Sequence, residues 1–246
     1  MAQKTAELSK NKVSELRKLL QKKYRDLEGR VVVEGLRTLQ QLHDDGFQPL
    51  EQYFTLGQKP VWNDVPAFSA QEWDLAKICD SQHPQGVAAL FKLPQERETK
   101  FKRAFYLDGI SDPGNLGTIF RIAAAFELDA ILLSPNCAEP GSPKVIRSSL
   151  GSVFKIPFQT LQTLQLKGLG AKILCTDASV GEPLRSFSPA QDEKSLIVLG
   201  SEAHGIGAEL KAMADAHLRI EMGKGTESLN VAVAAGIIAH HLYISR

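Results

Sequence analysis

Three glycine-rich loops carry most of the polar side chains that are suited to chemistry. They are DGISDPGNLGTIFR (108–121), GSEAHGIG (200–207) and MGKGTESLN (222–230). Their candidate site residues are Asn115, Arg121, Glu202, Ser228 and Asn230. Carboxamide, guanidinium, carboxylate and hydroxyl groups together can bind a phosphate and orient a hydroxyl group. The loops are therefore candidates for a site that holds a polar substrate.

Each of these residues also has an ordinary structural explanation. Asn115, Ser228 and Asn230 stand where helices are expected to begin, so each could serve only as a cap. Arg121 lies near the start of a helix expected over 116–126, where the helix dipole disfavours a cation, so an anionic partner is expected. That partner is either a phosphate or Glu202, which follows an apolar strand and itself needs a basic neighbour. The residues alone leave these alternatives open.

Several familiar catalytic patterns are absent from the sequence. It contains no GxxxxGK[ST], HExxH or GxSxG, which excludes the usual P-loop, zinc-protease and nucleophile-elbow sites. The glycines of the loops do not form GxGxxG, so a dinucleotide-binding dehydrogenase is weakly supported. His240 and His241 are adjacent, which places them about 100° apart on a helix with no carboxylate at ligand spacing. No metal site is predicted.

Alternating strands and helices are expected to position the loops. Strands are expected at 30–34, 50–56, 86–91, 104–109, 130–133, 153–157, 171–175, 195–199 and 217–220. Helices are expected at 9–24, 36–46, 70–79, 116–126, 159–166, 207–215 and 229–243. Such alternation predicts an α/β fold with a mostly parallel sheet, whose ligands bind outside the carboxyl ends of the strands. The three loops follow strands, so they are expected to meet at one site.

Positive charge is concentrated in two segments of this 246-residue chain, whose net charge is only +1. Residues 1–30 carry nine Lys and Arg against four acids, and residues 92–103 carry five against two. Clustered cations suit a polyanion such as nucleic acid, although they can also simply solvate a helix face. The polar stretch suggests a division into a substrate-binding domain (1–95), a linker (96–103) and a second domain (104–246).

The remaining composition is that of an ordinary globular protein. No apolar run approaches the roughly 18 residues that cross a bilayer, and the first residues lack a signal peptide's apolar segment. Cys79, Cys137 and Cys175 are scattered and form no CxxC pair, which is typical of reduced thiols. A cytoplasmic location without membrane association is expected.

Three segments of the chain resemble the motifs of a known enzyme family. They are LDGISDPGNLGTIFRIAAAF (107–126), LIVLGSEAHGIG (196–207) and IEMGKGTESLNVAVAAGI (220–237). Their order and their setting after strands are similar to those of the SpoU-type RNA ribose 2′-O-methyltransferases of the SPOUT superfamily. VVVEGLRTLQQL (31–42) is similar to that family's small RNA-binding domain, which itself resembles certain ribosomal proteins. Glu127 and Glu221 depart from the pattern, standing where many relatives have Gly and Pro.

The resemblance implies a fold and an assembly that the strand pattern does not show. It implies that the second domain contains a deep trefoil knot and that two chains form a homodimer with the active site at their interface. It also implies that S-adenosylmethionine is the cofactor, held mainly by backbone groups. The residues implied to surround it are Thr176, Gly200, Ile220, Met222 and Leu229.

The resemblance further implies a polar site that methylates a ribose 2′-hydroxyl of RNA without a metal. Asn115, Arg121, Glu202, Ser228 and Asn230 are its implied members. Arg121 is implied either to accept the hydroxyl proton or to clamp the substrate phosphate, and the clamp suits a guanidinium that stays protonated. Ribosomal RNA is favoured over transfer RNA because of the extra domain. An RNA-binding protein that lacks methyl transfer is the main alternative, and the intact polar residues argue against it.

Overall fold

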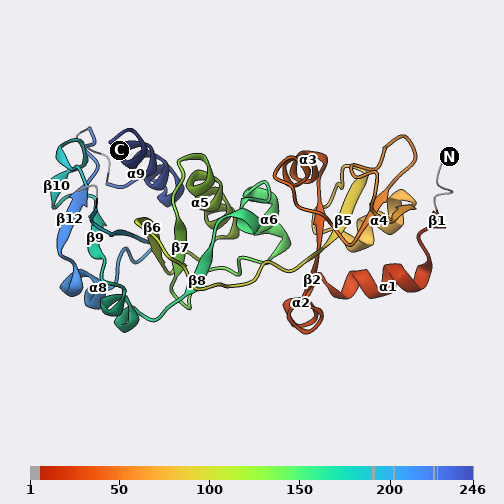
Figure 1. Ribbon diagram of the computed structural model, residues 1–246, viewed down its shortest axis with the longest axis horizontal. Coiled ribbons are helices and arrows are strands. Elements are labelled where there is room, and N and C mark those ends of the chain that lie inside the picture. The colour runs from red at the N-terminus through yellow and green to blue at the C-terminus, as the bar shows by residue number, and fades with distance from the viewer. Residues whose placement is uncertain (1–5, 190–191, 202, 224, 226, 246) are drawn as a thin grey trace. The chain divides into compact units, whose positions relative to one another are not determined.

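The computed structural model describes residues 6–189, 192–201, 203–223, 225 and 227–245. The chain divides into two compact units (Figure 1). The first unit comprises Met1–Pro94 together with Pro140–Gly151, and the second comprises Gln95–Glu139 and Ser152–Arg246. Within the described ranges no helix is both long and apolar enough to cross a membrane.

The first unit is built on a five-stranded mixed sheet. Its strands, in the order β1-β4-β3-β5-β2, are β1 (Ala6–Glu7), β4 (Ala67–Ser69), β3 (Glu51–Phe54), β5 (Val87–Lys92) and β2 (Arg30–Glu34). Its helices are α1 (Lys10–Lys18), α2 (Lys22–Glu28), α3 (Leu36–Asp44), α4 (Glu72–Ile78) and α6 (Pro143–Ser148). β5 pairs antiparallel with both β2 and β3. Apolar residues of α1 and α4, including Leu16, Leu75 and Ile78, form a core against this sheet.

The helix expected over 9–24 is instead two helices with a turn between them. Ser9 caps α1 by accepting a hydrogen bond from the backbone N–H of Lys12, and the helix ends at Lys18. The buried guanidinium of Arg25 then donates to the carbonyl oxygens of Leu19 and Leu20 at 3.0 and 2.8 Å. Because those carbonyls have a side-chain partner, the chain can leave the helix there without burying unsatisfied acceptors.

The segment 140–151 packs in the first unit, although the sequence-based division assigned it to 104–246. Its helix α6 contacts β2. Arg147 on α6 donates to the carboxylate of Glu34 at 2.8 Å and to that of Asp80 at 3.2 Å. Glu34 is only 4% exposed and also accepts hydrogen bonds from both the backbone N–H and the hydroxyl of Ser81. The segment is thus held by a charged partner more than a hundred residues away in sequence, which local patterns cannot reveal.

Replacing Arg147 with methionine should destabilise the first unit. The buried Glu34 carboxylate would lose its cation, and we expect the free energy of unfolding to fall by about 2 kcal/mol. Trp62 and Trp73, the protein's two tryptophans, both lie in this unit, so urea unfolding followed by tryptophan fluorescence measures it. Adding Glu34→Gln to the variant should restore part of the loss. A double variant less stable than Arg147→Met alone would contradict the charge argument.

The second unit contains a seven-stranded sheet in which every pairing is parallel. Its strands, in the order β10-β12-β9-β11-β6-β7-β8, are β10 (Glu182–Pro183), β12 (Ala216–Arg219), β9 (Lys172–Asp177), β11 (Ser195–Gly200), β6 (Arg103–Asp108), β7 (Ala130–Leu133) and β8 (Phe158–Thr160). The central strands are apolar along almost their whole length, as expected for parallel strands covered on both faces. The predicted parallel α/β architecture is confirmed for this unit.

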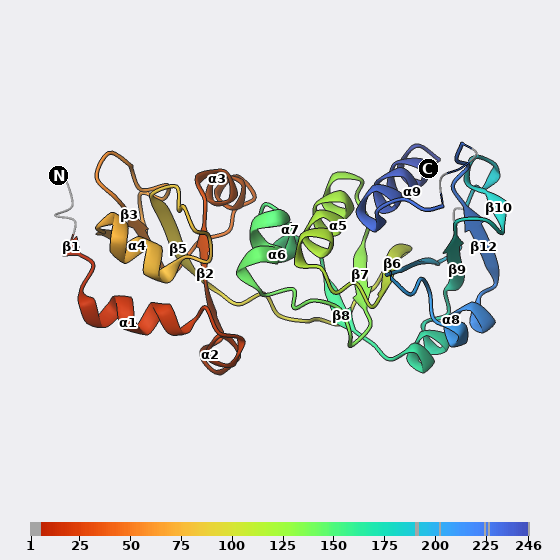
Figure 2. The same ribbon diagram turned by 180° about the vertical axis from the view of Figure 1, so that it is seen from behind.

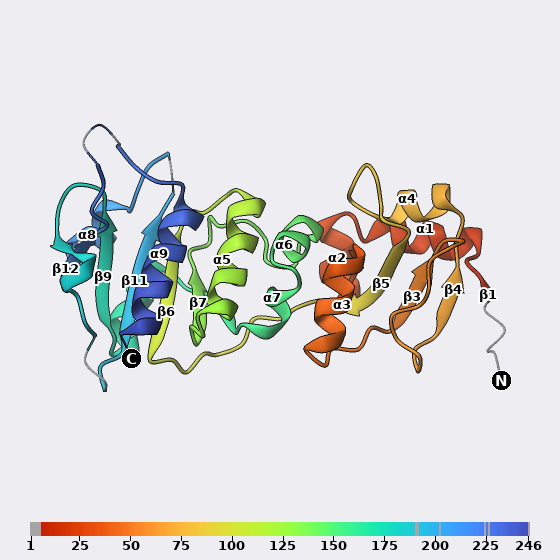
Figure 3. The ribbon, with the colours of Figure 1, turned by 90° about the horizontal axis from the view of Figure 1, so that it is seen from above.

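Helices cover both faces of this sheet. They are α5 (Pro113–Ala125), α7 (Ser152–Lys155), α8 (Ala208–Met213), α9 (Val231–Ile244) and the 3₁₀ helices η1 (Thr163–Leu169) and η2 (Leu184–Ser186). α5 and α9 lie side by side on one face (Figure 3), and α8 lies on the other (Figure 1, Figure 2). The polar loops of interest therefore lie at the edge where the strands end and α5 and α9 begin.

Two expected elements of this unit are wrong. The strand expected at 153–157 is the short helix α7 followed by a turn, and the strand lies just beyond it as β8. The helix expected at 159–166 is accordingly replaced by the end of β8 and by η1. α7 packs against α5, so tertiary contacts override the β-branched character of Val153 and Ile156.

Candidate active site

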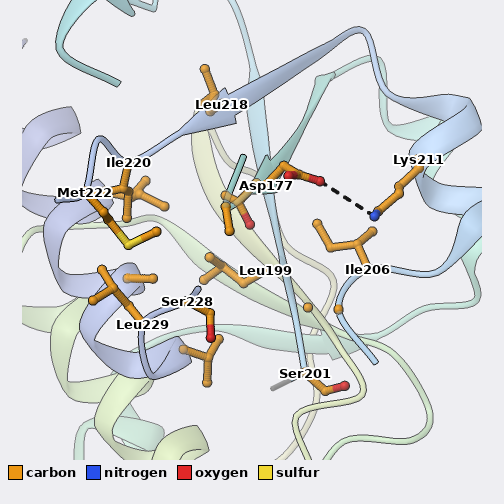
Figure 4. A pocket seen from close by; sticks show the side chains of 17 residues that line it. Asp177, Leu199, Ser201, Ile206, Lys211, Leu218, Ile220, Met222, Ser228 and Leu229 are labelled. Carbon is orange, nitrogen blue, oxygen red and sulfur yellow. Dashed lines mark ion pairs between the residues drawn. The ribbon is translucent and has the colours of Figure 1, made fainter. Parts of the chain in front are cut away.

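A cavity of about 290 Å³ lies at the carboxyl ends of β9, β11 and β12 (Figure 4). All five residues that the resemblance assigned to the cofactor line it: Thr176, Gly200, Ile220, Met222 and Leu229. They come from three separate segments of the chain, which the parallel sheet brings to one edge. The structure thus places the predicted cofactor residues around one hollow.

Gly200 shapes one wall of this cavity. β11 ends there and the chain folds back, so that the backbone of Gly205 and Ile206 passes directly over it. A Cβ atom at position 200 would lie 2.3 Å from the carbonyl carbon of Gly205. Gly205 has a φ of +64° and donates its N–H to the carbonyl of Ser201 at 2.8 Å, which closes the turn. Glycine is required at position 200 because the backbone approach leaves no room for a side chain.

Most of the remaining lining is apolar. It includes Leu199, Ile206, Leu218, Val231 and Ile238. The hydroxyl of Thr176 donates to the carbonyl of Val198 at 2.9 Å, which fixes the end of β9 against β11. A mostly apolar lining at the ends of parallel strands suits the heteroaromatic ring of a ligand.

The turn that leads into α9 separates this cavity from a second hollow. Ser228, Leu229 and Val231 line the cavity, whereas Asn230 and Val233 line a groove shared with α5. Neighbouring residues of one short turn therefore face two binding spaces. A group bound in the cavity and a group bound in the groove would be close neighbours across this turn.

Asn115 and Asn230 meet in the groove. The side-chain N–H of Asn230 donates to the side-chain oxygen of Asn115 at 3.1 Å. The oxygen of Asn230 accepts from the backbone N–H groups of Ala232 and Val233, so this residue is also the cap of α9. The sequence left cap and site as alternatives for Asn230, and the geometry shows that the cap also orients Asn115.

The position of Asn115 and Arg121 on α5 differs from the expectation. The cap of α5 is Asp112, whose carboxylate accepts the backbone N–H of Asn115 at 2.8 Å, and Pro113 is the first helical residue. Because the helix begins three residues earlier than expected, Arg121 lies in its third turn, away from the positive end. The dipole argument for an anionic partner of Arg121 is therefore wrong.

Arg121 is exposed, and it forms no ion pair with any described residue. It lies six residues beyond Asn115 on the same helix, a rise of about 9 Å. Glu202, its predicted partner, lies outside the described residues. Ser228 is exposed at the rim of the cavity, and it is not the cap of α9. The structure thus joins Asn115 to Asn230 and leaves the Arg121 side chain accessible to a ligand.

The two departures from the family pattern have distinct structural settings. Glu127 follows α5 with a φ of +51°, a left-handed conformation that favours glycine, the residue that the family resemblance implies at this position. Glu221 forms an ion pair with Arg185 at 2.8 Å. Neither glutamate lines the cavity.

The terminal histidines have structural neighbours. The ring of His240 packs edge-on against Phe126, and Nε2 of His241 lies 2.6 Å from the carbonyl oxygen of Phe187. Among the residues that the structure describes, no group of three or more His, Cys, Asp or Glu side chains is placed to hold a metal ion.

Asp177 and Lys211 are charged residues of the cavity that no pattern in the sequence singled out. Both line the cavity, and their charged groups lie 3.7 Å apart. Asp177 is the last residue of β9, so its position at a strand end is the same signal that identified the three loops. The loop that follows, TDASVGE (176–182), has no recognisable catalytic pattern, so only its place after a strand marks it.

The chain matches two family models, one for each half of the sequence. Residues 102–240 match the SpoU rRNA Methylase family, and residues 10–89 match the MRM3-like substrate binding domain. The first match covers more than half of the chain and contains all ten predicted site residues. The protein belongs to the SpoU rRNA methylase family.

Individual relatives are similar to this protein over nearly the whole length of the chain. The 23S rRNA (guanosine(2553)-2′-O)-methyltransferase RlmP of Bacillus subtilis is 30% identical over 97% of this chain and 99% of its own length. The structure of a putative RNA methyltransferase of the TrmH family from Porphyromonas gingivalis superposes with a TM-score of 0.81 at 29% identity, covering 96% of this chain and 98% of that one. An AdoMet-bound rRNA methyltransferase from Sinorhizobium meliloti superposes with a TM-score of 0.78 at 28% identity, covering 96% and 95%.

Proposed function

We propose that this protein transfers a methyl group from S-adenosylmethionine to a ribose 2′-hydroxyl of RNA, with ribosomal RNA as the favoured substrate. The observation that carries the proposal is the segment 228–233, whose residues line both the cavity and the groove that holds the Asn115–Asn230 pair. A methyl donor in the cavity and a hydroxyl beside the pair would both adjoin this segment, and their reacting atoms would have to meet at the open rim of the cavity, where Ser228 lies. Direct transfer between two bound groups needs this kind of proximity.

The cavity fits the proposed cofactor. Its apolar walls can enclose adenine, and the close approach of the 205–206 backbone over Gly200 presents peptide groups to the edge of the ring. The Sinorhizobium meliloti relative was solved with AdoMet bound, and the Bacillus subtilis relative is named as an rRNA 2′-O-methyltransferase. These relatives support the assignment of both cofactor and reaction.

When bound, S-adenosylmethionine supplies an electrophilic methyl group, so the chain itself must chiefly hold the hydroxyl in line and order the substrate. Asn115, fixed by Asn230, and Ser228 at the cavity rim are proposed to bind the ribose and its phosphate. Arg121 is proposed to clamp the substrate phosphate with both arms of its guanidinium, which stays protonated and is a poor base. Glu202 is proposed to orient Arg121 on the basis of the resemblance alone.

The first unit is proposed to bind the RNA backbone. Of the basic residues in 1–30, Lys12 and Arg30 form ion pairs with acids, and Arg25 is buried on carbonyl groups. The cations of α1 and α2 that are exposed and form no ion pair among the described residues are Lys10, Arg17, Lys18 and Lys23. Lys10, Arg17 and Lys18 can reach phosphates without giving up an internal partner among the described residues, whereas the ammonium of Lys23 also lies over the ring of Tyr24, 5.9 Å from its centroid.

Replacing Lys10, Arg17 and Lys18 together with glutamine should weaken RNA binding and flatten its salt dependence. Each lost phosphate contact should reduce the slope of log K against log[salt] by about 0.7 to 0.9. Filter binding across a series of salt concentrations measures both quantities. S-adenosylmethionine affinity should not change, because the cavity residues all belong to the second unit. An unchanged slope would remove this face from the RNA-binding surface.

The homodimer is proposed to use the outer face of α9. Val233 and Ile237, two apolar residues of α9, are 51% and 39% exposed, and both line the groove beside Asn115. Exposed apolar side chains gathered at one groove mark a protein interface. A partner there would place its surface next to the proposed ribose site.

Ile237→Asp should therefore convert a dimer to a monomer at micromolar concentration, because the interface would have to bury an unpaired charge. Sedimentation equilibrium measures the change. Leu164→Asp is the matched control, since Leu164 is 67% exposed on η1, away from the groove, and should leave the dimer intact. A wild-type protein that sediments as a monomer would exclude the assembly.

The proposed reaction is tested by incubating the protein with methyl-labelled S-adenosylmethionine and unmodified ribosomal or transfer RNA. Nuclease digestion and mass spectrometry should then show a 2′-O-methylated nucleoside. A protein that binds RNA and S-adenosylmethionine without transfer would instead be a binding module. Calorimetric binding of NAD in place of S-adenosylmethionine would point to a dehydrogenase.

Two further features complete the proposal. The cysteines Cys79, Cys137 and Cys175 are all free thiols, which supports the reducing cytoplasm as the location. The trefoil knot that the resemblance implies stays a prediction for the second unit.

A further inference from the structure

Asp177 and Lys211 are the only charged side chains among the described residues that line the cavity. Figure 4 shows them on one side, whereas Met222 and Leu229 lie on the opposite side. The cavity therefore has an apolar part and one charged margin. A ligand that fills it should have an apolar portion and, at one end, hydrogen-bond donors for the carboxylate.

The two oxygens of the Asp177 carboxylate have different surroundings. Oδ1 accepts hydrogen bonds from the backbone N–H and hydroxyl of Ser179 and from the backbone N–H of Val180, at 2.9, 3.1 and 3.2 Å. These hydrogen bonds lower the pKa of Asp177, and the bond from the Ser179 backbone has the largest effect. The carboxyl group therefore stays ionised at neutral pH. The hydrogen bonds to Oδ1 hold the carboxylate in the loop, and they thereby fix the direction in which Oδ2 points.

Oδ2 of Asp177 forms an ion pair with Lys211, and the distance from Oδ2 to Nζ of Lys211 is 3.7 Å. That separation is longer than a hydrogen bond, and the Asp177 side chain is only 22% exposed. An ionised, half-buried oxygen without a closely bound donor is a strong acceptor site for a ligand. It excludes an anionic group at this margin and favours hydroxyl or ammonium donors.

We propose that Asp177 recognises the ribose hydroxyls of the nucleoside bound in this cavity, with its carboxylate held in place by the Ser179 turn. The inference rests on the proposed function, because it identifies the nucleoside as that of S-adenosylmethionine. The ribose carries two adjacent hydroxyl donors next to the heteroaromatic ring, which matches a carboxylate beside an apolar slot. An acid at the end of a parallel strand binds ribose in the same way in dinucleotide-binding folds. Asp177 is thereby a specificity-determining residue for ribose over deoxyribose ligands.

The proposal is tested by calorimetric binding of 5′-methylthioadenosine, its 2′-deoxy and 3′-deoxy analogues, and S-adenosylmethionine. Methylthioadenosine keeps adenine and ribose but lacks the amino-acid group. The wild-type protein should prefer the intact ribose by about tenfold or more, the value of a charge-assisted hydrogen bond. Asp177→Asn keeps an acceptor for the Ser179 turn and should reduce that preference to less than about threefold.

Two further variants separate the ribose contact from general effects. Asp215→Asn is the matched control: Asp215 also accepts a backbone N–H, that of Ile173 at 2.8 Å, but at the other end of β9 and outside the cavity. It should keep the full preference. Lys211→Met should keep most of it, because the acceptor oxygen of Asp177 remains.

The outcomes distinguish the proposal from its alternatives. If Asp177→Asn weakens every analogue by the same factor, the residue shapes the loop and the proposal is overturned. If it weakens S-adenosylmethionine but not methylthioadenosine, Asp177 contacts the amino-acid group, which also overturns it. If the wild-type protein binds neither nucleoside, the proposed function itself fails. Binding of both without ribose discrimination overturns only the role of Asp177.

Discussion

Arg121→Ala should reduce methyl transfer by a factor of about 10³ or more while leaving the affinity for S-adenosylmethionine nearly unchanged. Arg121 is exposed and does not line the cavity, so its removal leaves the cofactor contacts intact. The guanidinium would instead hold the phosphate of the substrate while the hydroxyl aligns. Single-turnover transfer at saturating RNA and cofactor isolates this step from binding.

Arg121→Lys separates the two explanations of that loss. Lysine keeps the positive charge but lacks the fork that binds two phosphate oxygens, so a simple electrostatic role predicts substantial rescue. Bidentate clamping or proton acceptance predicts that lysine restores little of the methyl-transfer rate. We expect this second result. A near-wild-type rate for Arg121→Ala would remove the residue from the catalytic site and leave it as a structural residue of α5.

The strands of the second unit could be predicted because their sequences carry a strong physical signal. The runs AFYL, AILL and SLIVL lie within β6, β7 and β11, and they are apolar on both faces because helices cover both faces of the sheet. The cofactor residues then come together through topology. Glycine-rich segments that follow parallel strands must meet at one edge of the sheet.

Other features depend on partners that are distant in sequence. The break between α1 and α2 depends on Arg25, and the placement of 140–151 depends on the buried carboxylate of Glu34. The predicted start of α5 is wrong for a local reason, because Asp112 and Pro113 form a stronger helix-start signal than Asn115. Asp177 could not be predicted because a lone acid at the end of a strand has no distinguishing pattern until the cavity beside it is known.

Gly200→Ala should abolish measurable S-adenosylmethionine binding, a loss of at least about 100-fold in affinity. The added Cβ would lie within 2.5 Å of three backbone atoms of Gly205 and Ile206, so the folded-back segment must move away from β11. That segment forms part of the cavity wall, and the cofactor would lose the peptide groups that the wall presents. Isothermal calorimetry measures the loss, and far-ultraviolet circular dichroism checks that the fold is kept.

Gly207→Ala is the matched control in the same loop. A Cβ at position 207 would make only an ordinary contact, 3.5 Å from a carboxylate oxygen of Asp108, and the N–H that binds this carboxylate would remain. The φ of Gly207 is −59°, which alanine adopts without strain. This variant should bind S-adenosylmethionine with nearly wild-type affinity. Equal losses in the two variants would show that the loop tolerates no substitution at all, whereas unchanged affinity in Gly200→Ala would move the cofactor site away from this cavity.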